Sequence, residues 1–130
     1  MEPGTPSFYE KVYKVVRCIP PGQVSSYGRI ATMLGHPNAA RAVGYALSAL
    51  RHPNQDGYTS ANVPWQRVVN SQGRISIRHR EQAANKQADL LRAERVTVDE
   101  NGRIDLATHL WPGLHLIELD DIFRNDPQEP

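Results

Sequence analysis

The first strong pattern along the chain is an apolar repeat with helical spacing that begins near residue 8. Apolar side chains recur every three or four positions, at Phe8, Val12, Val15, Val16 and Ile19. This spacing is typical of the buried face of an α-helix. Ser7-Phe8-Tyr9-Glu10 has the Ser-x-x-Glu form of a capping box, and Pro20-Pro21-Gly22 cannot continue a helix. The pattern predicts a first helix that ends before Pro20.

Two shorter helices are predicted next. Ser26 can cap a helix that carries Ile30, Ala31 and Leu34, with Gly35 in the left-handed position that commonly ends a helix. Asn38 can cap a third helix from Ala39 to about Leu50. Two short helices joined by a tight turn are typical of a helix-turn-helix, placed here at about residues 26–50.

The third helix has two distinct faces when it is projected at 100° per residue. One face is an apolar stripe: Ala39, Val43, Ala46, Leu47 and Leu50. The opposite face is polar: Arg41, Tyr45, Ser48 and His52. Gly44 lies between them, although glycine costs about 1 kcal/mol relative to alanine inside a helix. A glycine here indicates that another group approaches the backbone closely.

The rest of the chain predicts smaller elements. Residues 53–62 form a polar loop, and an extended-turn-extended unit follows around Asn70-Ser71-Gln72-Gly73. A helix is predicted from about Glu81 to Glu94, with Ala84, Ala88 and Leu91 on one face. A small hairpin is predicted around Glu100-Asn101-Gly102. Near the C-terminus, four apolar residues stand close to helical spacing: Leu116, Leu119, Ile122 and Phe123. We expect a frayed terminus there, and a docked helix is the alternative.

Composition places the chain among single-domain proteins with an uneven distribution of charge. Its 130 residues suffice for one hydrophobic core. Residues 114–130 hold five acidic residues and one arginine, a net charge of −4, whereas the other 113 residues hold 14 basic and 9 acidic residues, a net of +5. A basic body suits a polyanionic partner. No apolar run approaches the ~20 residues of a membrane span, and the N-terminus lacks the features of a secretory signal.

The candidate chemistry is sparse. Cys18 is the single cysteine, which excludes an internal disulfide and fits a reducing compartment. The five histidines show no spacing typical of a metal site, and no glycine-rich loop could cradle a phosphate. We therefore expect neither a metal nor another cofactor.

Three segments together resemble the O6-alkylguanine-DNA alkyltransferases. Val63-Pro64-Trp65-Gln66-Arg67-Val68 resembles their Pro-Cys-His-Arg-Val signature, with Trp65 at the cysteine position and Gln66 at the histidine position. Residues 19–31 resemble their Ile-Pro-x-Gly-x-Val-x-Thr-Tyr-Gly-x-Ile-Ala segment, and residues 39–47 their Ala-Ala-Arg-Ala-Val-Gly-x-Ala-Met helix. The resemblance covers about residues 8–111 and excludes the zinc-bearing N-terminal domain of some members. The substitutions are typical of the alkyltransferase-like proteins, which bind alkylated guanine without repairing it.

The resemblance implies a fold that is mainly α with small β elements (α+β). It would be a winged-helix-like helix-turn-helix DNA-binding domain of the alkyltransferase C-terminal type. Residues 1–113 would form this domain, and residues 114–130 an acidic tail.

The substitutions also imply the loss of alkyl transfer. An indole is not a nucleophile at neutral pH, and an amide cannot act as a general base. Cys18 is a poor substitute, because it falls at the end of the first helix, where the helix dipole disfavours a thiolate. Gln66, Arg67 and Glu94 are then interpreted as a structural remnant of the family's active site.

The resemblance further implies a set of binding residues. Arg41 would fill the gap left by an extruded nucleotide, and Tyr27 would press on the phosphate beside the lesion. The lesion pocket would consist of Trp65, Arg78, Tyr27, Pro64 and Val63. Further DNA contacts would come from Ala42, Gly44, Tyr45 and Ser48 on the third helix.

The function implied is non-enzymatic recognition of O6-alkylguanine in duplex DNA, by minor-groove binding and base flipping. The implied partners are double-stranded DNA with this lesion and nucleotide excision repair proteins, and a monomer is expected. The bound lesion would be flagged for excision repair and hidden from alkyltransferases. Such a protein would work at the nucleoid in a bacterial cytoplasm or in a eukaryotic nucleus. Two alternatives remain: a transferase that uses Cys18, and a helix-turn-helix regulator indifferent to alkylation.

Overall fold

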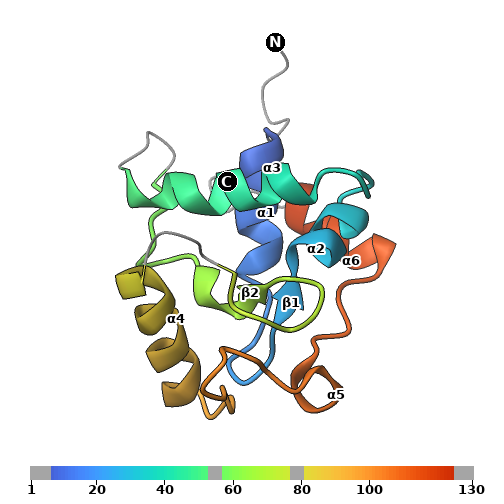
Figure 1. Cartoon of the computed structure of the whole chain (residues 1–130). Coiled ribbons are helices and arrows are strands. Elements are labelled where there is room, and N and C mark those ends of the chain that lie inside the picture. Colours follow the sequence, from blue (N-terminus) through green and yellow to red (C-terminus); the bar gives the residue numbers. More distant parts are fainter. Residues whose placement is uncertain (1–6, 53–56, 77–80, 125–130) are drawn as a thin grey trace.

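The computed structural model describes residues 7–52, 57–76 and 81–124, and it is predominantly helical in this part of the chain. The helices are α1 (Phe8–Val16), α2 (Tyr27–Met33), α3 (Ala40–Ser48), α4 (Glu81–Ala93), α5 (Leu106–His109) and α6 (Leu116–Arg124). Two 3-10 turns, η1 (Ala49–Arg51) and η2 (Trp65–Arg67), and two short strands, β1 (Ser25–Ser26) and β2 (Val68–Val69), complete it. Figure 1 shows α3 lying across one end of the molecule, over α1.

Helix α1 is the central element of the larger hydrophobic core. The Glu10 N–H donates to the Ser7 hydroxyl at 3.2 Å, so the predicted cap is present. Val12, Val15 and Val16 are fully buried. The Tyr13 hydroxyl donates to the Ala46 carbonyl at 2.6 Å, which joins α1 to α3 within the core. The first predicted helix is confirmed.

Helices α2 and α3 form the predicted helix-turn-helix. Ser26 caps α2 by accepting from the Arg29 N–H at 3.2 Å, and Gly35 has a φ of +83°. The predicted cap at Asn38 is wrong. The Ala39 N–H donates to the His36 carbonyl at 2.9 Å, and this turn delays the helix start by one residue. Ala39 is therefore the N-cap, without a side-chain hydrogen bond.

The two faces of α3 are confirmed. Val43, Ala46 and Leu50 are buried in the core. The opposite face carries the exposed side chains of Arg41, Tyr45 and Ser48, whereas His52, also predicted on this face and also exposed, follows η1 in extended backbone. The helix therefore presents a polar, partly aromatic surface to solvent.

The small sheet is parallel, not a hairpin. Strands β1 and β2 pair with Ser25 opposite Val68 and Ser26 opposite Val69. The predicted turn at residues 70–73 forms, since the Asn70 side chain accepts from the Gln72 and Arg74 N–H groups at 2.9 Å. The predicted hairpin at residues 96–106 is reduced to an isolated antiparallel bridge between Val98 and Ile104.

Helix α4 covers a second, smaller core. This core consists of Val24, Val69, Leu91, Val96, Val98 and Ile104, with Ala88 packed against it. The predicted helix over about residues 81–94 is confirmed, ending at Ala93. No helix of the described ranges is long and apolar enough to cross a bilayer.

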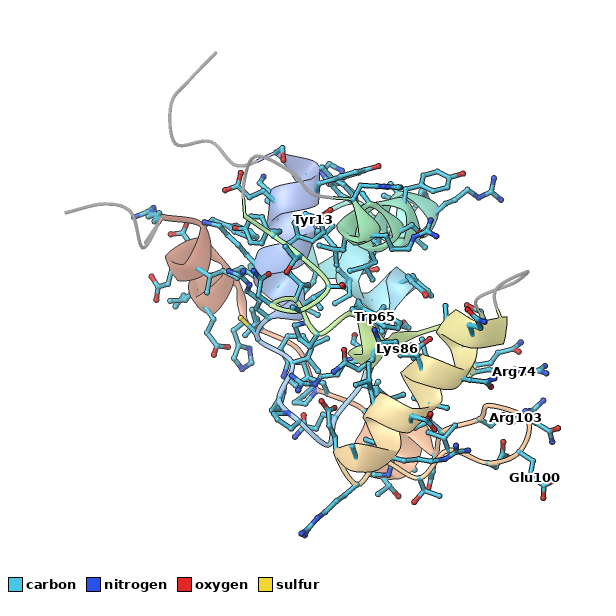
Figure 2. The ribbon with its side chains drawn as sticks, turned by 90° about the vertical axis from the view of Figure 1, so that its left-hand side faces the viewer. Tyr13, Trp65, Arg74, Lys86, Glu100 and Arg103 are labelled. Atoms are coloured by element: carbon cyan, nitrogen blue, oxygen red, sulfur yellow. The ribbon has the colours of Figure 1, made fainter. Side chains whose placement is uncertain are left out.

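The expectation of a frayed terminus is wrong for residues 116–124, which form α6 and pack on α1. Leu119 is 6% exposed within the larger core, and Ile122 and Phe123 pack against that core. The Lys11 ammonium lies 5.5 Å from the centre of the Phe123 ring. Apolar residues at helical spacing find a complementary surface on α1, which the sequence alone does not reveal. In Figure 2, α6 and α4 lie on opposite sides of the molecule.

Docking of α6 predicts that Leu119→Ala lowers the free energy of unfolding by about 2–3 kcal/mol, because it empties a buried position. Guanidinium denaturation followed by circular dichroism measures this. Leu116→Ala is the matched control on the same helix, since Leu116 is 83% exposed. The control should change stability by less than about 0.5 kcal/mol. Similar small effects of both substitutions would mean that α6 does not dock in solution.

Candidate nucleic-acid interface

The turn η2 sets the position of Trp65. Pro64 precedes the turn with a φ of −77°, and the Arg67 N–H donates to the Pro64 carbonyl at 3.0 Å. The indole is half-buried, whereas the next side chain, Gln66, is buried. The turn thus directs Trp65 toward the surface and Gln66 toward the interior.

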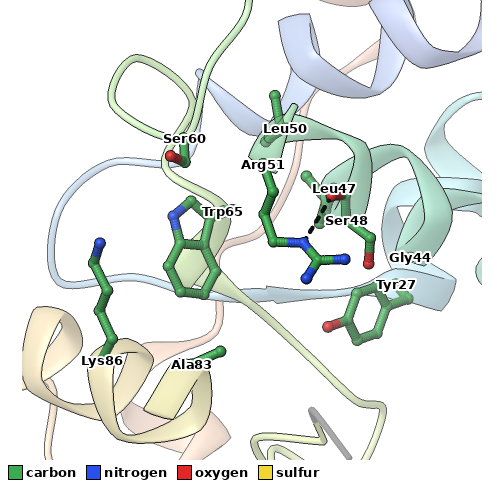
Figure 3. A pocket seen from close by; sticks show the side chains of 10 residues that line it. All are labelled: Tyr27, Gly44, Leu47, Ser48, Leu50, Arg51, Ser60, Trp65, Ala83 and Lys86. Atoms are coloured by element: carbon green, nitrogen blue, oxygen red, sulfur yellow. Dashed lines mark hydrogen bonds between the residues drawn. The ribbon is translucent and has the colours of Figure 1, made fainter. Parts of the chain in front are cut away.

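Trp65 forms one wall of a cavity of about 210 Å³, called the first cavity here. Tyr27 lies across the cavity from Trp65, and α3 and α4 supply the other sides (Figure 3). Such a volume is below the roughly 300–1,000 Å³ of drug-sized sites and suits a smaller planar ligand. The lining residues are Tyr27, Gly44, Leu47, Ser48, Leu50, Arg51, Ser60, Trp65, Ala83 and Lys86.

Tyr27 and Gly44 meet at one side of the first cavity. Two carbons of the Tyr27 ring lie 4.0 Å from where a Cβ of Gly44 would stand. The group that approaches this glycine is therefore the Tyr27 ring, at an ordinary contact distance. Burial raises the pKa of the Tyr27 phenol, and its hydrogen bond with Ser76 partly opposes that rise. The phenol consequently stays protonated at neutral pH and can donate a hydrogen bond.

Arg67 and Glu94 form a short ion pair behind Trp65. Arg67 Nη2 lies 2.6 Å from Glu94 Oε2, and Arg67 Nε donates to Glu94 Oε1 at 3.0 Å. The side chains are only 14% and 16% exposed. Arg67 Nη1 also donates to the Ile19 carbonyl at 2.7 Å, and Gln66 Nε2 donates to Glu94 Oε2 at 3.0 Å. The predicted remnant, Gln66, Arg67 and Glu94, is thus one network.

The three side chains of this network are a guanidinium, a carboxylate and an amide. A carboxylate held by a guanidinium and an amide has no imidazole through which to withdraw a proton. Its geometry therefore supports a role in holding the turn η2.

Gln87 supports the same turn and was not predicted. Its Nε2 donates to the carbonyls of Gln66 and Val68, each at 3.0 Å, and the residue is 1% exposed. It shares the helical spacing of Ala84, Ala88 and Leu91. A polar residue in that apolar stripe is the signal that could have identified it.

Two cations of the first cavity were also not predicted. Arg51 Nε donates to the Ser48 carbonyl at 3.2 Å, and Figure 3 shows its guanidinium between the rings of Trp65 and Tyr27. Lys86 projects from α4 beside Trp65 (Figures 2 and 3). Arg51 follows Ser48 by three residues, so the projection of α3 could have indicated it. Nothing in the sequence joins Lys86 to this site.

The predicted pocket residues are only partly brought together. Tyr27 and Trp65 line the first cavity. Val63 is fully buried in the larger core, and with Pro64 it borders a second cavity of about 510 Å³. The two cavities share Ser60, Trp65 and Lys86. Arg78 lies outside the described residues.

The predicted DNA-contacting residues lie along one surface of α3. Arg41, Tyr45 and Ser48 are exposed, Tyr45 at 59%. Ala42 and Gly44 are half-buried, and Gly44 and Ser48 also line the first cavity. The polar face of α3 therefore continues directly into that cavity.

Cys18 belongs to neither cavity. It is half-buried at the end of α1, where its thiol donates to the Lys14 carbonyl at 3.4 Å. Burial raises the pKa of the Cys18 thiol, and the nearby charge of Glu118 raises it further. A raised pKa keeps the group protonated and weakly nucleophilic. In the described ranges, no three His, Cys, Asp or Glu residues are grouped to hold a metal ion.

Known proteins share this sequence pattern. The family model of the 6-O-methylguanine DNA methyltransferase, DNA binding domain, matches residues 7–96. The chain is 41% identical over 104 residues to a DNA base-flipping protein of Vibrio parahaemolyticus, covering 80% of this chain and 95% of that one. It is 40% identical over 108 residues to alkyltransferase-like protein 1 of Schizosaccharomyces pombe, covering 80% and 94%.

Solved structures share the fold. S. pombe Atl1 in complex with damaged DNA containing O6-carboxymethylguanine matches with a TM-score of 0.67 and 38% identity, over 80% of this chain and 94% of that one. The O6-methylguanine methyltransferase of Mycobacterium tuberculosis matches with a TM-score of 0.54 and 30% identity, over 78% of this chain and 54% of that one. The predicted fold class is confirmed.

The ion pair behind Trp65 predicts that Glu94→Ala lowers the free energy of unfolding by about 3 kcal/mol, because it leaves the Arg67 charge buried without its partner. Chemical denaturation measures the loss. Asp89→Ala is the control, since it removes the exposed carboxylate that lies 3.8 Å from Arg92. That change should cost less than about 0.5 kcal/mol. If the two variants were equally stable, the network would not hold η2 in place.

Proposed function

Because the chain belongs to the family of 6-O-methylguanine DNA methyltransferase DNA-binding domains, we propose that it recognises O6-alkylguanine in duplex DNA by flipping the base and leaves the alkyl group in place. One observation carries this proposal: the polar face of α3 opens into a cavity whose wall, at the position of the family's acceptor cysteine, is the indole of Trp65.

The first cavity supports binding of a flipped base. The indole and the Tyr27 ring offer flat surfaces on which a guanine can stack, and Leu47, Leu50 and Ala83 offer apolar contact to an alkyl group. Stacking on side chains replaces the stacking that the base loses when it leaves the duplex. The first cavity therefore lies next to α3, the helix that we propose contacts the DNA.

Helix α3 supports an approach to the DNA backbone. Arg41 is exposed on its outer face, where it can enter the duplex and occupy the gap left by the flipped nucleotide. Filling that gap offsets the few kcal/mol that unstacking costs. Tyr45 and Ser48 add neutral donors suited to phosphate and sugar contacts. Tyr27, at the junction of helix and cavity, is placed to contact the phosphate beside the lesion.

The absence of alkyl transfer follows from chemistry. Trp65 has no nucleophilic atom at neutral pH, Gln66 cannot act as a base, and Cys18 lies outside the cavity with a raised pKa. A lesion held without repair would act as a flag for nucleotide excision repair and would be hidden from alkyltransferases. Both consequences are part of this proposal.

The direct test is a gel-shift titration at fixed salt with two duplexes that differ only in a central guanine or O6-methylguanine. Salt must be fixed because phosphate contacts alone change affinity by orders of magnitude. We expect at least about tenfold tighter binding to the alkylated duplex, a difference of roughly 1.4 kcal/mol. A radiolabelled methyl group should remain on the DNA. Equal affinities would indicate a general helix-turn-helix DNA-binding protein, and label on the protein would indicate a transferase.

The role of Arg41 predicts that Arg41→Ala lowers affinity for the O6-methylguanine duplex by about tenfold or more, with a smaller loss on the guanine duplex. The reason is that a gap in the base stack exists only when a base is flipped, so only the flipped complex loses the side chain that would fill it. Fluorescence of 2-aminopurine beside the lesion would report the loss of flipping. Arg124→Ala is the control, because it removes a charge from α6 on another side of the molecule. Unchanged lesion affinity of Arg41→Ala would contradict the flipping account.

A further inference from the structure

The described residues that line the first cavity carry two positive charges and no negative one. Of its ten lining residues, Arg51 and Lys86 are the charged ones, and the others are apolar, aromatic or hydroxyl-bearing. The two cations come from different elements, η1 and α4, and stand on either side of the Trp65 ring in Figure 3. The cavity therefore favours a ligand that carries negative charge.

Arg51 is anchored by one hydrogen bond, and none of the ion pairs among the described residues includes it. Its Nε donates to the Ser48 carbonyl at 3.2 Å, which anchors the guanidinium at the side of the cavity (Figure 3). The terminal nitrogens have no hydrogen-bond acceptor among the described residues. A guanidinium presented in this way can make two parallel hydrogen bonds to a carboxylate.

Lys86 also has no ion-pair partner in the part of the chain that the structure describes. The ion pairs in the described part of the chain join Arg67 to Glu94, Arg92 to Asp89 and Arg124 to Asp120, so neither Lys86 nor Arg51 takes part in one. Lys86 borders both cavities, and its ammonium lies beside the indole. A flexible ammonium can follow a ligand group that extends past Trp65.

Resting on the proposed function, we propose that this protein prefers O6 substituents that carry a negative charge, such as a carboxymethyl group, and that Arg51 and Lys86 set this preference. Leu47, Leu50 and Ala83 line the same cavity, whereas Arg51 and Lys86 are exposed, so an ionic contact with either cation is screened by solvent and modest in size. A neutral substituent would leave both cations without a counter-charge. A substituent with a carboxylate would supply one at the place where the alkyl group must lie.

The test compares three duplexes that differ only in the central base: guanine, O6-carbamoylmethylguanine and O6-carboxymethylguanine. The two adducts have the same number of heavy atoms and nearly the same shape, so their difference isolates the charge. At fixed salt we expect the carboxymethyl duplex to bind about fivefold more tightly than the carbamoylmethyl duplex. The double variant Arg51→Gln/Lys86→Gln should bring this ratio close to one, and each single variant should reduce it in part.

The ratio of the affinities for the carboxymethyl and carbamoylmethyl duplexes also distinguishes recognition of the substituent from contacts with the DNA phosphates. If the two cations served only the DNA backbone, the variants would weaken all three complexes by the same factor and leave the ratio unchanged, which would overturn the proposal. Arg103→Gln is the matched control, because Arg103 lines neither cavity and lies away from Trp65, near Glu100, in Figure 2. Its ratio should equal that of the unaltered protein.

The guanine duplex separates this proposal from the proposed function. If the carbamoylmethyl duplex binds more tightly than guanine but the two adducts bind equally, only the charge preference fails. If neither adduct binds more tightly than guanine, both proposals fail. The double variant must retain its preference for the carbamoylmethyl adduct over guanine, which shows that its cavity is intact. Should it fail to fold, the two single variants supply the ratio, and an undiminished ratio in both overturns the proposal.

Discussion

The ion pair between Arg67 and Glu94 is the interaction on which the rest of the site depends. Arg67 lies in the turn η2, Glu94 directly follows α4, and the second hydrogen bond of Arg67 reaches the Ile19 carbonyl after α1. Three segments that are distant in sequence therefore meet at one guanidinium. A short, charge-assisted pair of this kind restrains the turn η2 against the end of α4. The position of Trp65 follows from that geometry.

The same arrangement explains how a reactive site can lose its chemistry and keep its shape. Gln66 donates to Glu94 at 3.0 Å, so the buried carboxylate keeps a hydrogen-bonded neighbour although no histidine is present. Gln87 donates hydrogen bonds to the backbone carbonyls of Gln66, in the turn, and Val68, directly after it. Substituting the two reactive positions thus leaves no buried charge unpaired, and the scaffold has no energetic reason to rearrange. The indole of Trp65 then forms a wall of the first cavity, which is the proposed binding site for the flipped base.

Acidic and basic side chains are concentrated on different elements of the structure. Glu118, Asp120 and Asp121 lie on α6, which packs on α1 and is on the side of the molecule away from α4 (Figure 2). The cations Arg41, Arg51 and Lys86 lie on α3, η1 and α4. These three cations are exposed beside the cavity and on the outer face of α3, and positive side chains there favour the approach of a polyanion. Docking of α6 thereby serves both the stability of the core and the electrostatics of the surface.

The sequence by itself determined the local features of this protein. The caps at Ser7 and Ser26 and the two faces of α3 depend on residues close in sequence, so periodicity and capping rules were sufficient, whereas the assignment of Trp65 to the acceptor position came from the resemblance to a known family. Only the tertiary structure decided which distant residues meet. The parallel pairing of β1 with β2, the docking of α6 and the convergence of Arg51 and Lys86 on Trp65 all depend on packing between elements that are far apart in the chain. Even the start of α3 was displaced by one residue, because a backbone turn through Ala39 replaced the expected cap at Asn38. Local preferences are set by neighbouring residues, whereas a cavity is set by the three-dimensional arrangement of the elements that surround it.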